Sequence, residues 1–263
     1  MTAPLATRVA GPEGAPAVVL LHAIATSSAL WEPQIATWAE TLRVVAVDLP
    51  GHGASPLTQA PPSLDSYAQA VLATMDALDV ERAALVGLSL GSSISQRLAV
   101  QAPERVRAVV LAAGAAYSPP PAQAMWRGRA DDARAHGVGG QVEAILERWF
   151  TAEFRASAPT AVERIKQLVL STSTEGYVAA AEIISTLDNR SLLGRIACPT
   201  LVVAGEHDKA IPLEALKHIA EAIPNSRLAS VPAAHLLNIE AAAVVTDLVG
   251  RFLATTLTSS SHV

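Results

Sequence analysis

The sequence of 263 residues has a single cysteine, Cys198, and few aromatic or charged side chains. One cysteine excludes an internal disulfide and any metal cluster that is held by several cysteines. Aromatic residues make up 4% and charged residues 16% of the chain, whereas 51% of the residues are hydrophobic. Because the formal net charge is -5, we expect no basic surface that would bind a nucleic acid.

The hydrophobic composition does not come from a membrane-spanning segment. The longest stretch without a charged residue, 108–126, contains Ser118 and the three consecutive prolines 119–121, which forbid a continuous helix. Residues 1–14 lack a basic region followed by an apolar run, which is the pattern of a signal peptide. We therefore expect a cytoplasmic protein without a membrane partner.

Short apolar runs that alternate with helical patterns indicate a parallel sheet. Apolar residues recur at helical spacing in 64–78 and 91–101, and either Ser63 or Asp65 could cap the first of these helices. Alternation of this kind is typical of an α/β fold, in which helices cover both faces of a mostly parallel sheet. The length suits one large domain, or a domain with an insertion. Buried strands are predicted at 18–21, 44–47, 84–86, 106–111 and 201–204.

One region breaks the alternation. From about 119 to 190 the pattern is only helical, and six of the ten aromatic residues lie between positions 117 and 177. We interpret this region as a helical lid, so that residues 1–118 and 191–263 form the core and residues 119–190 form an insertion. The alternative is that the aromatic side chains only hold a small helical subdomain together.

The segment 87–91 reads Gly-Leu-Ser-Leu-Gly and lies between a predicted strand and a predicted helix. In this context the pattern Gly-x-Ser-x-Gly places a serine on a sharp turn, where glycines are needed because a β-carbon would clash. Ser89 would then stand at the carboxyl edge of the sheet, at a helix N-terminus that favours developing negative charge. A phosphate or dinucleotide loop is a weaker alternative, because the third glycine of Gly-x-Gly-x-x-Gly and a Gly-Lys-Ser/Thr sequence are lacking.

A nucleophilic serine needs a base, and the base needs an acid that orients it. Asp208 and His235 each follow a short apolar run, so both are expected in loops at one edge of the sheet. Either residue alone could be a turn acid or a surface histidine. Together with Ser89 they give the chain order Ser-Asp-His, which predicts a catalytic triad. His207 has no further ligands at metal-site spacing, so we expect no metal.

Acyl transfer also requires N–H groups that bind the oxyanion. The backbone N–H of Leu90, which follows the nucleophile, is one candidate. The second should come from the loop after the strand 18–21, where we assign Ile24. That loop reads His-Ala-Ile-Ala at a place where glycines are frequent.

With these motifs, the chain resembles the α/β-hydrolase superfamily over nearly its whole length. Within it, the chain resembles the 3-oxoadipate enol-lactone hydrolases of aromatic catabolism. The lid segments and the Ala-His-Leu-x-Asn-x-Glu run discriminate better than the serine turn, which serine hydrolases of this fold share. Two departures flank the oxyanion region, the loop 22–25 and Ser92 in place of a frequent glycine. The segments that carry the likeness are 31–34, 48–55, 87–91, 147–151, 176–180, 205–208 and 234–240.

The resemblance implies a serine hydrolase without cofactor that acts on a small lactone or ester, with 3-oxoadipate enol-lactone as the expected substrate. Such a substrate carries a carboxylate, which calls for a guanidinium partner. Arg129, three residues after Trp126, is the first candidate, and Arg127 is the second. Trp126 and Trp149 are the expected substrate-binding aromatic residues. The alternative for the arginines is a solvated helix face.

Two other functions are compatible with the same residues. One is a general carboxylesterase or cofactor-free perhydrolase with the same triad. The other is a non-catalytic ligand receptor on this fold, against which the complete set of Ser89, Asp208 and His235 argues. A homo-oligomer is also compatible with the sequence.

Overall fold

Seven strands form one sheet within residues 3–58 and 60–258, which are the residues that the computed structural model describes. They are β1 (Thr7–Ala10), β2 (Ala17–Leu21), β3 (Arg43–Val47), β4 (Ala83–Leu88), β5 (Val106–Ala112), β6 (Thr200–Gly205) and β7 (Ser226–Val231). Their order is β1-β3-β2-β4-β5-β6-β7, and every neighbouring pair is parallel except β1 and β3. The predicted α/β fold is therefore confirmed, and the five predicted strands are β2 to β6. Strand β1 is short and half exposed, and its sequence does not predict a strand.

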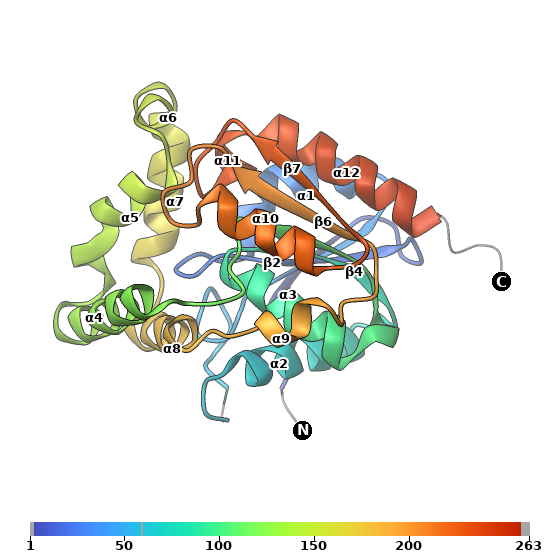
Figure 1. Cartoon of the computed structure of the whole chain (residues 1–263), viewed down its shortest axis with the longest axis horizontal. Helices are drawn as coiled ribbons and strands as arrows, with labels where there is room; N and C mark the ends of the chain where they lie inside the picture. Colours follow the sequence, from blue (N-terminus) through green and yellow to red (C-terminus); the bar gives the residue numbers. More distant parts are fainter. Residues whose placement is uncertain (1–2, 59, 259–263) are drawn as a thin grey trace.

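Helices connect the strands on both sides of the sheet (Figure 1). Ser63 caps α2, because its side chain accepts a hydrogen bond from Ser66 N at 3.0 Å and the Ser66 hydroxyl accepts one from Ser63 N at 2.9 Å. Asp65, the other candidate cap, lies inside the first turn. The α-helices are α1 (Glu32–Trp38), α2 (Leu64–Ala77), α3 (Leu90–Gln101), α4 (Pro120–His136), α5 (Val142–Trp149), α6 (Ala152–Ser157), α7 (Pro159–Leu170), α8 (Thr174–Ser185), α9 (Arg190–Leu193), α10 (Leu213–Ala222), α11 (Leu237–Glu240) and α12 (Ala242–Thr258). Short 3-10 helices span Ser28–Trp31, Pro103–Arg105 and Val138–Gln141.

The direction of the connections reverses at β2. The connection from β2 to β3 runs toward one edge of the sheet, whereas those from β3 to β4 and from β4 to β5 run toward the other. Right-handed crossovers therefore place α1 on one face and α2, α3 and α10 on the opposite face. Helix α12 lies beside α1, where Trp38 Nε1 donates to the carbonyl oxygen of Thr246 at 3.1 Å. The expected covering of both faces is confirmed.

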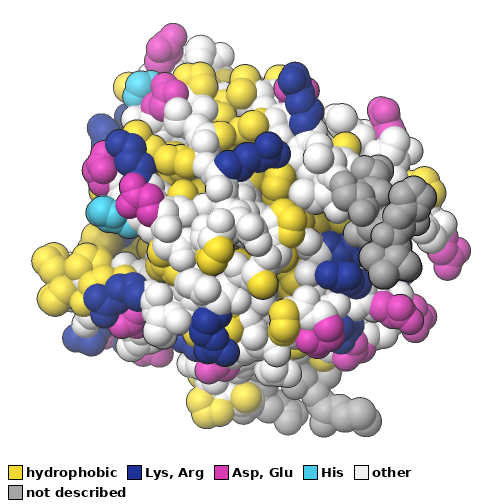
Figure 2. All heavy atoms as spheres, turned by 45° about the vertical axis from the view of Figure 1, so that its right-hand side comes forward, with side chains coloured by type: hydrophobic (Ala, Val, Ile, Leu, Met, Phe, Trp, Pro, Cys, Tyr) yellow, Lys and Arg dark blue, Asp and Glu magenta, His cyan; other side chains and the backbone are white. Residues whose placement is uncertain are grey.

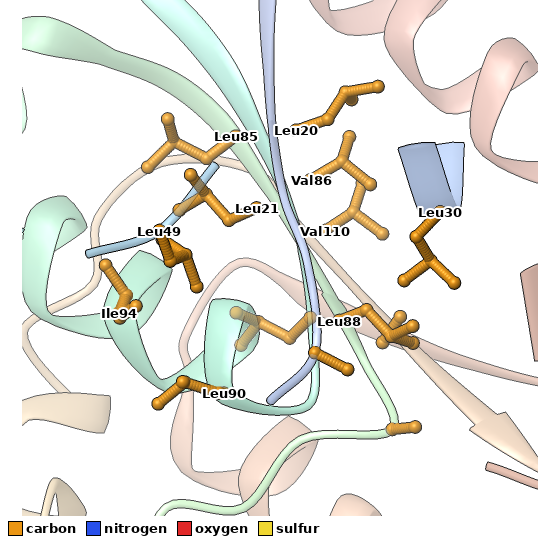
Figure 3. Close-up of a cluster of buried hydrophobic side chains, with 14 of the residues drawn as sticks. Leu20, Leu21, Leu30, Leu49, Leu85, Val86, Leu88, Leu90, Ile94 and Val110 are labelled. Atoms are coloured by element: carbon orange, nitrogen blue, oxygen red, sulfur yellow. The ribbon is translucent and has the colours of Figure 1, made fainter. Parts of the chain in front are cut away.

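The core lies on both faces of the central strands. Residues of β2 and β4 are buried along their whole length, as is typical of parallel strands that helices cover on both sides. Figure 3 shows Leu20 of β2 and Val110 of β5 on the side of Leu30, and Leu85 of β4 on the opposite side with Leu49 and Ile94. Many of the hydrophobic residues of the chain are therefore buried in this sheet and against the elements that cover it. No helix in the described part of the chain combines the length and the hydropathy that crossing a membrane requires.

The segment between β5 and β6 contains α4 to α9. Helices α4 to α8 lie at one end of the sheet, on the left in Figure 1, whereas α9 lies beside α3. The two ends of the segment lie side by side, because Ser118 N donates to Leu187 O at 3.0 Å and Asn189 N donates to Ala116 O at 2.6 Å. We refer to residues 119–190 as the lid segment. In this segment, the rings of Phe150 and Phe154 stack with their centroids 5.1 Å apart.

The surface carries charges of both signs. On the face in Figure 2, Lys and Arg side chains lie among Asp and Glu side chains, and exposed apolar atoms form separate small groups. Some of these opposite charges form ion pairs. Arg97 of α3 lies 3.3 Å from Asp65 of α2, for example.

We predict that Gly91→Ala lowers the free energy of unfolding by at least about 2 kcal/mol, as overpacking of a rigid site does. A β-carbon on Gly91 would lie 2.1 Å from the carbonyl oxygen of Leu21, which belongs to a central strand and cannot move aside. The matched control is Gly128→Ala in α4, where the added carbon meets nothing within 4 Å. It should raise the free energy of unfolding by about 0.5–1 kcal/mol. Urea unfolding measures both values, and equal effects would contradict the prediction.

Candidate active site

Ser89 occupies the turn between β4 and α3, with a φ of 54° and a ψ of -111°. A positive φ is strained for a residue that carries a β-carbon. Close packing requires both flanking glycines, since a β-carbon on Gly87 would lie 2.3 Å from the carbonyl oxygen of Gly91. The turn therefore presents Ser89 above the carboxyl edge of the sheet, at the N-terminus of α3.

His235 lies in the loop between β7 and α11 and contacts both Ser89 and Asp208. Its Nε2 is 3.0 Å from Ser89 Oγ, and its Nδ1 is 2.8 Å from Asp208 Oδ2. Because a carboxylate only accepts hydrogen bonds, Nδ1 carries the proton and Nε2 is free to accept the serine proton. The other carboxylate oxygen of Asp208 accepts N–H bonds from Ala210 at 2.7 Å and Ile211 at 3.1 Å. The structure thus brings together the three residues predicted as a triad.

The backbone N–H groups of Ile24 and Leu90, the predicted oxyanion donors, belong to residues that line the same cavity as Ser89. Neither N–H has a hydrogen-bond acceptor among residues 3–58 and 60–258. The Ala23 carbonyl accepts bonds from His22 Nδ1 at 2.7 Å and Thr26 Oγ1 at 2.8 Å. Since the carbonyl and the N–H of one trans peptide point in opposite directions, these two bonds also set the direction of the Ile24 N–H.

His22 and His52 are buried behind this loop, with ring centroids 5.3 Å apart. His22 Nε2 accepts a hydrogen bond from Leu49 N at 2.8 Å, which leaves the proton on Nδ1. Burial, and secondarily the nearby His52, lower the pKa of His22 to about 3. Burial lowers the pKa of His52 to about 4. Both rings are therefore neutral at pH 7 and serve as uncharged hydrogen-bonding groups.

A cavity of about 360 Å³ opens in front of Ser89 and His235. Most of its lining is apolar, and its aromatic residues are Tyr117, Trp126 and Trp149. Two of the predicted substrate-binding residues, Trp126 and Trp149, therefore lie at the cavity. The Trp149 ring stacks on the His235 ring with a centroid distance of 6.4 Å and an interplanar angle of 28°.

The charged side chains of the cavity lining are Arg129, Arg148 and Lys209, and no Asp or Glu of the described residues belongs to it. The Arg129 guanidinium lies 4.7 Å from the centroid of the Trp126 ring. Arg127, the second predicted arginine, is exposed on α4 and does not line the cavity. A residue two positions from Arg129 points about 200° away around the helix, so the two arginine side chains face different ways.

Arg148 is a cavity residue that the sequence motifs do not single out. Its side chain is half-buried and forms no ion pair with any acid in the described residues. Burial lowers its pKa, against a smaller opposing effect of Tyr177. A partly desolvated cation without a counter-charge costs free energy, which a bound anion would offset. The sequence signals for Arg148 are that it directly precedes Trp149 and belongs to the segment 147–151, which carries part of the likeness to the enol-lactone hydrolases.

Comparisons with known proteins identify the fold family. The family model described as alpha/beta hydrolase fold matches residues 16–242. The 3-oxoadipate enol-lactonase 2 of Acinetobacter baylyi is 33% identical to this chain, over 88% of this chain and 85% of that protein. The solved structure of the enol-lactonase from Burkholderia xenovorans LB400 has a TM-score of 0.92 at 33% identity and covers 95% of this chain and 96% of its own. A malate-bound thermophilic esterase from Thermogutta terrifontis has a TM-score of 0.90 at 27% identity, with coverages of 96% and 93%.

We predict that His52→Asn makes the stability less dependent on pH in acid. The folded chain holds His52 neutral down to a pKa of about 4, whereas the unfolded chain binds a proton below its ordinary value of about 6.5. The free energy of unfolding therefore falls as the pH decreases from about 6.5 to 4, by about 1.4 kcal/mol per pH unit for one such histidine. Asparagine removes this titration and retains a donor for the Pro50 carbonyl, which His52 Nδ1 contacts at 3.0 Å. Urea unfolding between pH 4 and 7.5 tests the slope, and parallel curves for the two proteins would refute the assignment.

Proposed function

Because this chain belongs to the α/β-hydrolase fold family, we propose that it is a serine hydrolase of a small lactone or ester that bears a carboxylate. The first candidate substrate is 3-oxoadipate enol-lactone. The observation that carries the proposal is the cavity, where the hydrogen-bonded chain of Ser89, His235 and Asp208 faces a space lined by three cations and, among the described residues, by no acid. The enol-lactonases at 33% identity support a lactone, and the malate-bound esterase supports a carboxylate-bearing ligand.

In the first half of the proposed reaction, Ser89 Oγ attacks the lactone carbonyl carbon and His235 Nε2 takes the hydroxyl proton. Asp208 holds the imidazole in the required tautomer and stabilises the imidazolium that forms. The carbonyl oxygen becomes an oxyanion, which the N–H groups of Ile24 and Leu90 bind. The ring C–O bond then breaks, the proton passes from His235 to the enol oxygen, and the chain remains attached to Ser89 as an acyl ester.

In the second half, a water molecule replaces the leaving oxygen. His235 takes a proton from the water, whose oxygen attacks the acyl carbon, and the same N–H groups bind the second oxyanion. Collapse of this intermediate breaks the bond to Ser89 Oγ, which recovers the proton from His235. The enol formed in the first half becomes a ketone, and this tautomerisation favours the products. No step in this sequence calls for a cofactor.

The three cations would recognise the carboxylate of the substrate. Binding a carboxylate should stabilise Arg148 the most, because its side chain is half-buried and has no ion-pair partner in the described residues. Arg129 also lines the cavity, with its guanidinium over the Trp126 ring. Arginine binds a carboxylate with two parallel hydrogen bonds, so either position can fix the orientation as well as the charge.

We predict that the wild-type protein hydrolyses 3-oxoadipate enol-lactone with a kcat/KM at least 100-fold above that for p-nitrophenyl acetate. Ser89→Ala should lower both activities by at least about 1,000-fold, as loss of a triad nucleophile does. A fluorophosphonate probe should label Ser89 in the folded protein and fail to label the urea-unfolded chain. Faster turnover of the acetate ester would favour a general carboxylesterase or perhydrolase. Absence of both labelling and turnover would favour a ligand receptor on this fold.

We predict that Arg148→Met and Arg129→Met each raise the KM for the enol-lactone by about 10-fold or more, since a charge-assisted hydrogen bond contributes about 1.5–3 kcal/mol. The KM for p-nitrophenyl acetate, which has no carboxylate, should stay within about twofold. Arg127→Met is the matched control, because Arg127 is exposed on the same helix as Arg129 and lies outside the cavity lining. An equal rise of KM for both substrates would show that these arginines do not bind the substrate carboxylate.

A further inference from the structure

The two segments that most distinguish the sequence are in contact in the structure. Residues 149–151 are the last residue of α5 and the two residues after it, in the lid segment. Residues 234–240 include His235 and helix α11. Leu236 N donates to the Trp149 carbonyl oxygen at 3.1 Å, and the Trp149 ring stacks on His235. The lid segment therefore touches the candidate base directly.

Glu240 makes the second connection between these segments. Its Oε2 accepts a hydrogen bond from Ala234 N at 2.9 Å, and its Oε1 accepts one from Thr151 N at 3.2 Å and another from the Thr151 hydroxyl. Thr151 Oγ1 in turn accepts a bond from Phe154 N at 3.1 Å, which caps α6. No Lys, Arg or His of the described residues pairs with Glu240, so neutral N–H and O–H donors alone satisfy this half-buried carboxylate.

These contacts hold the backbone on both sides of His235. The N–H of Ala234 is bound by Glu240, and the N–H of Leu236 is bound by the Trp149 carbonyl. His235 itself lies outside any strand or helix, so neighbouring contacts rather than a hydrogen-bonded ladder fix its backbone. A general base must lie within about 2.6–3.2 Å of the group whose proton it takes, and small displacements lower the rate steeply.

We propose that Glu240 is a positioning residue for His235, which ties Thr151 of the lid segment to the backbone beside the imidazole. The proposal rests on the proposed hydrolase function of the same site. Glu240 does not touch the reacting atoms; it acts through Ala234 and Thr151. The lid segment is then part of the support for the base, in addition to covering the cavity.

The chemistry of this link requires a carboxylate of this length. Donors approach both oxygens of Glu240, so a glutamine must turn its NH2 group toward one N–H donor and lose that bond. An aspartate is shorter by one methylene and cannot reach both donors from the same backbone position. Either change leaves a buried N–H or hydroxyl of the link without its acceptor.

The test compares Glu240→Gln with Glu32→Gln. Glu32 of α1 forms an ion pair with Arg164 of α7, so Glu32→Gln loosens the lid segment at a place away from His235. We expect Glu240→Gln to lower kcat for the enol-lactone by about 10- to 100-fold, with KM within about threefold. Its rate of inactivation by a small neutral fluorophosphonate, which does not need the lid cations, should fall in parallel. Glu32→Gln should leave both rates within about twofold.

A second pair of variants distinguishes loss of this link from a general loss of folding. Thr151→Val loses the hydroxyl bond to Glu240 and should lower kcat and the inactivation rate, whereas Thr151→Ser keeps the hydroxyl and should restore both. Ser63→Ala removes a helix cap far from the site, on α2, and should lower the melting temperature without lowering either rate. In the double variant Thr151→Val/Glu240→Gln, the losses should be less than additive, because both changes break one link.

Three outcomes would overturn the proposal: wild-type rates in Glu240→Gln, equal losses in Glu240→Gln and Glu32→Gln, or a Thr151→Ser variant as slow as Thr151→Val. If Glu240→Gln does not fold, the Thr151 pair decides alone. A wild-type protein that neither reacts with the fluorophosphonate nor turns over substrate would refute the proposed function. A reactive wild type with an equally reactive Glu240→Gln would refute only the positioning role.

Discussion

The strained backbone of Ser89 is the constraint on which the rest of the structure depends. A positive φ at such a residue costs on the order of 1–3 kcal/mol, and it persists only where the surroundings dictate it. Here Ser89 N donates to Ala112 O at 2.9 Å and Gly91 N donates to His22 O at 3.2 Å. The turn is thus fastened to the ends of β5 and β2. The buried parallel strands that make the composition so apolar are therefore the same elements that hold the candidate nucleophile in place.

The reversal of strand order at β2 determines where a ligand can enter. Loops after β2 and β4 lead away from each other, which opens a crevice at the carboxyl ends of the strands. Ile24 follows β2 and Ser89 follows β4, so the candidate donor and nucleophile meet at this point. Asp208 and His235 follow β6 and β7 and reach the same edge from the other side. The four residues come from distant parts of the chain, and the topology brings them to one edge of the sheet.

The sequence predicts the sheet and the three hydrogen-bonded residues because their signals are local: an apolar run, a glycine pattern and a residue after a strand. It does not predict β1, whose four residues are half exposed and pair with a buried neighbour. Nor can it separate Arg127 from Arg129 by composition, since only the rotation of α4 over the cavity decides between them. The link between Thr151 and Glu240 spans 89 residues, and no spacing rule connects positions so far apart. The residues that line the cavity and the contacts between distant segments can be identified only from the packed structure.

A single stretch of four residues joins the charge of the cavity to the support of the base. Arg148 lies at the cavity, Trp149 stacks on His235, and Thr151 binds Glu240. Under the proposed function, a substrate carboxylate bound at Arg148 would neutralise the partly desolvated charge of that side chain. The same four residues also contact the His235 imidazole and its supporting backbone. Binding energy from a part of the substrate that does not react would then be available to hold the base in place in the transition state. A neutral ester can reach Ser89 but makes no such contact, so discrimination between the two substrates should appear in kcat as well as in KM.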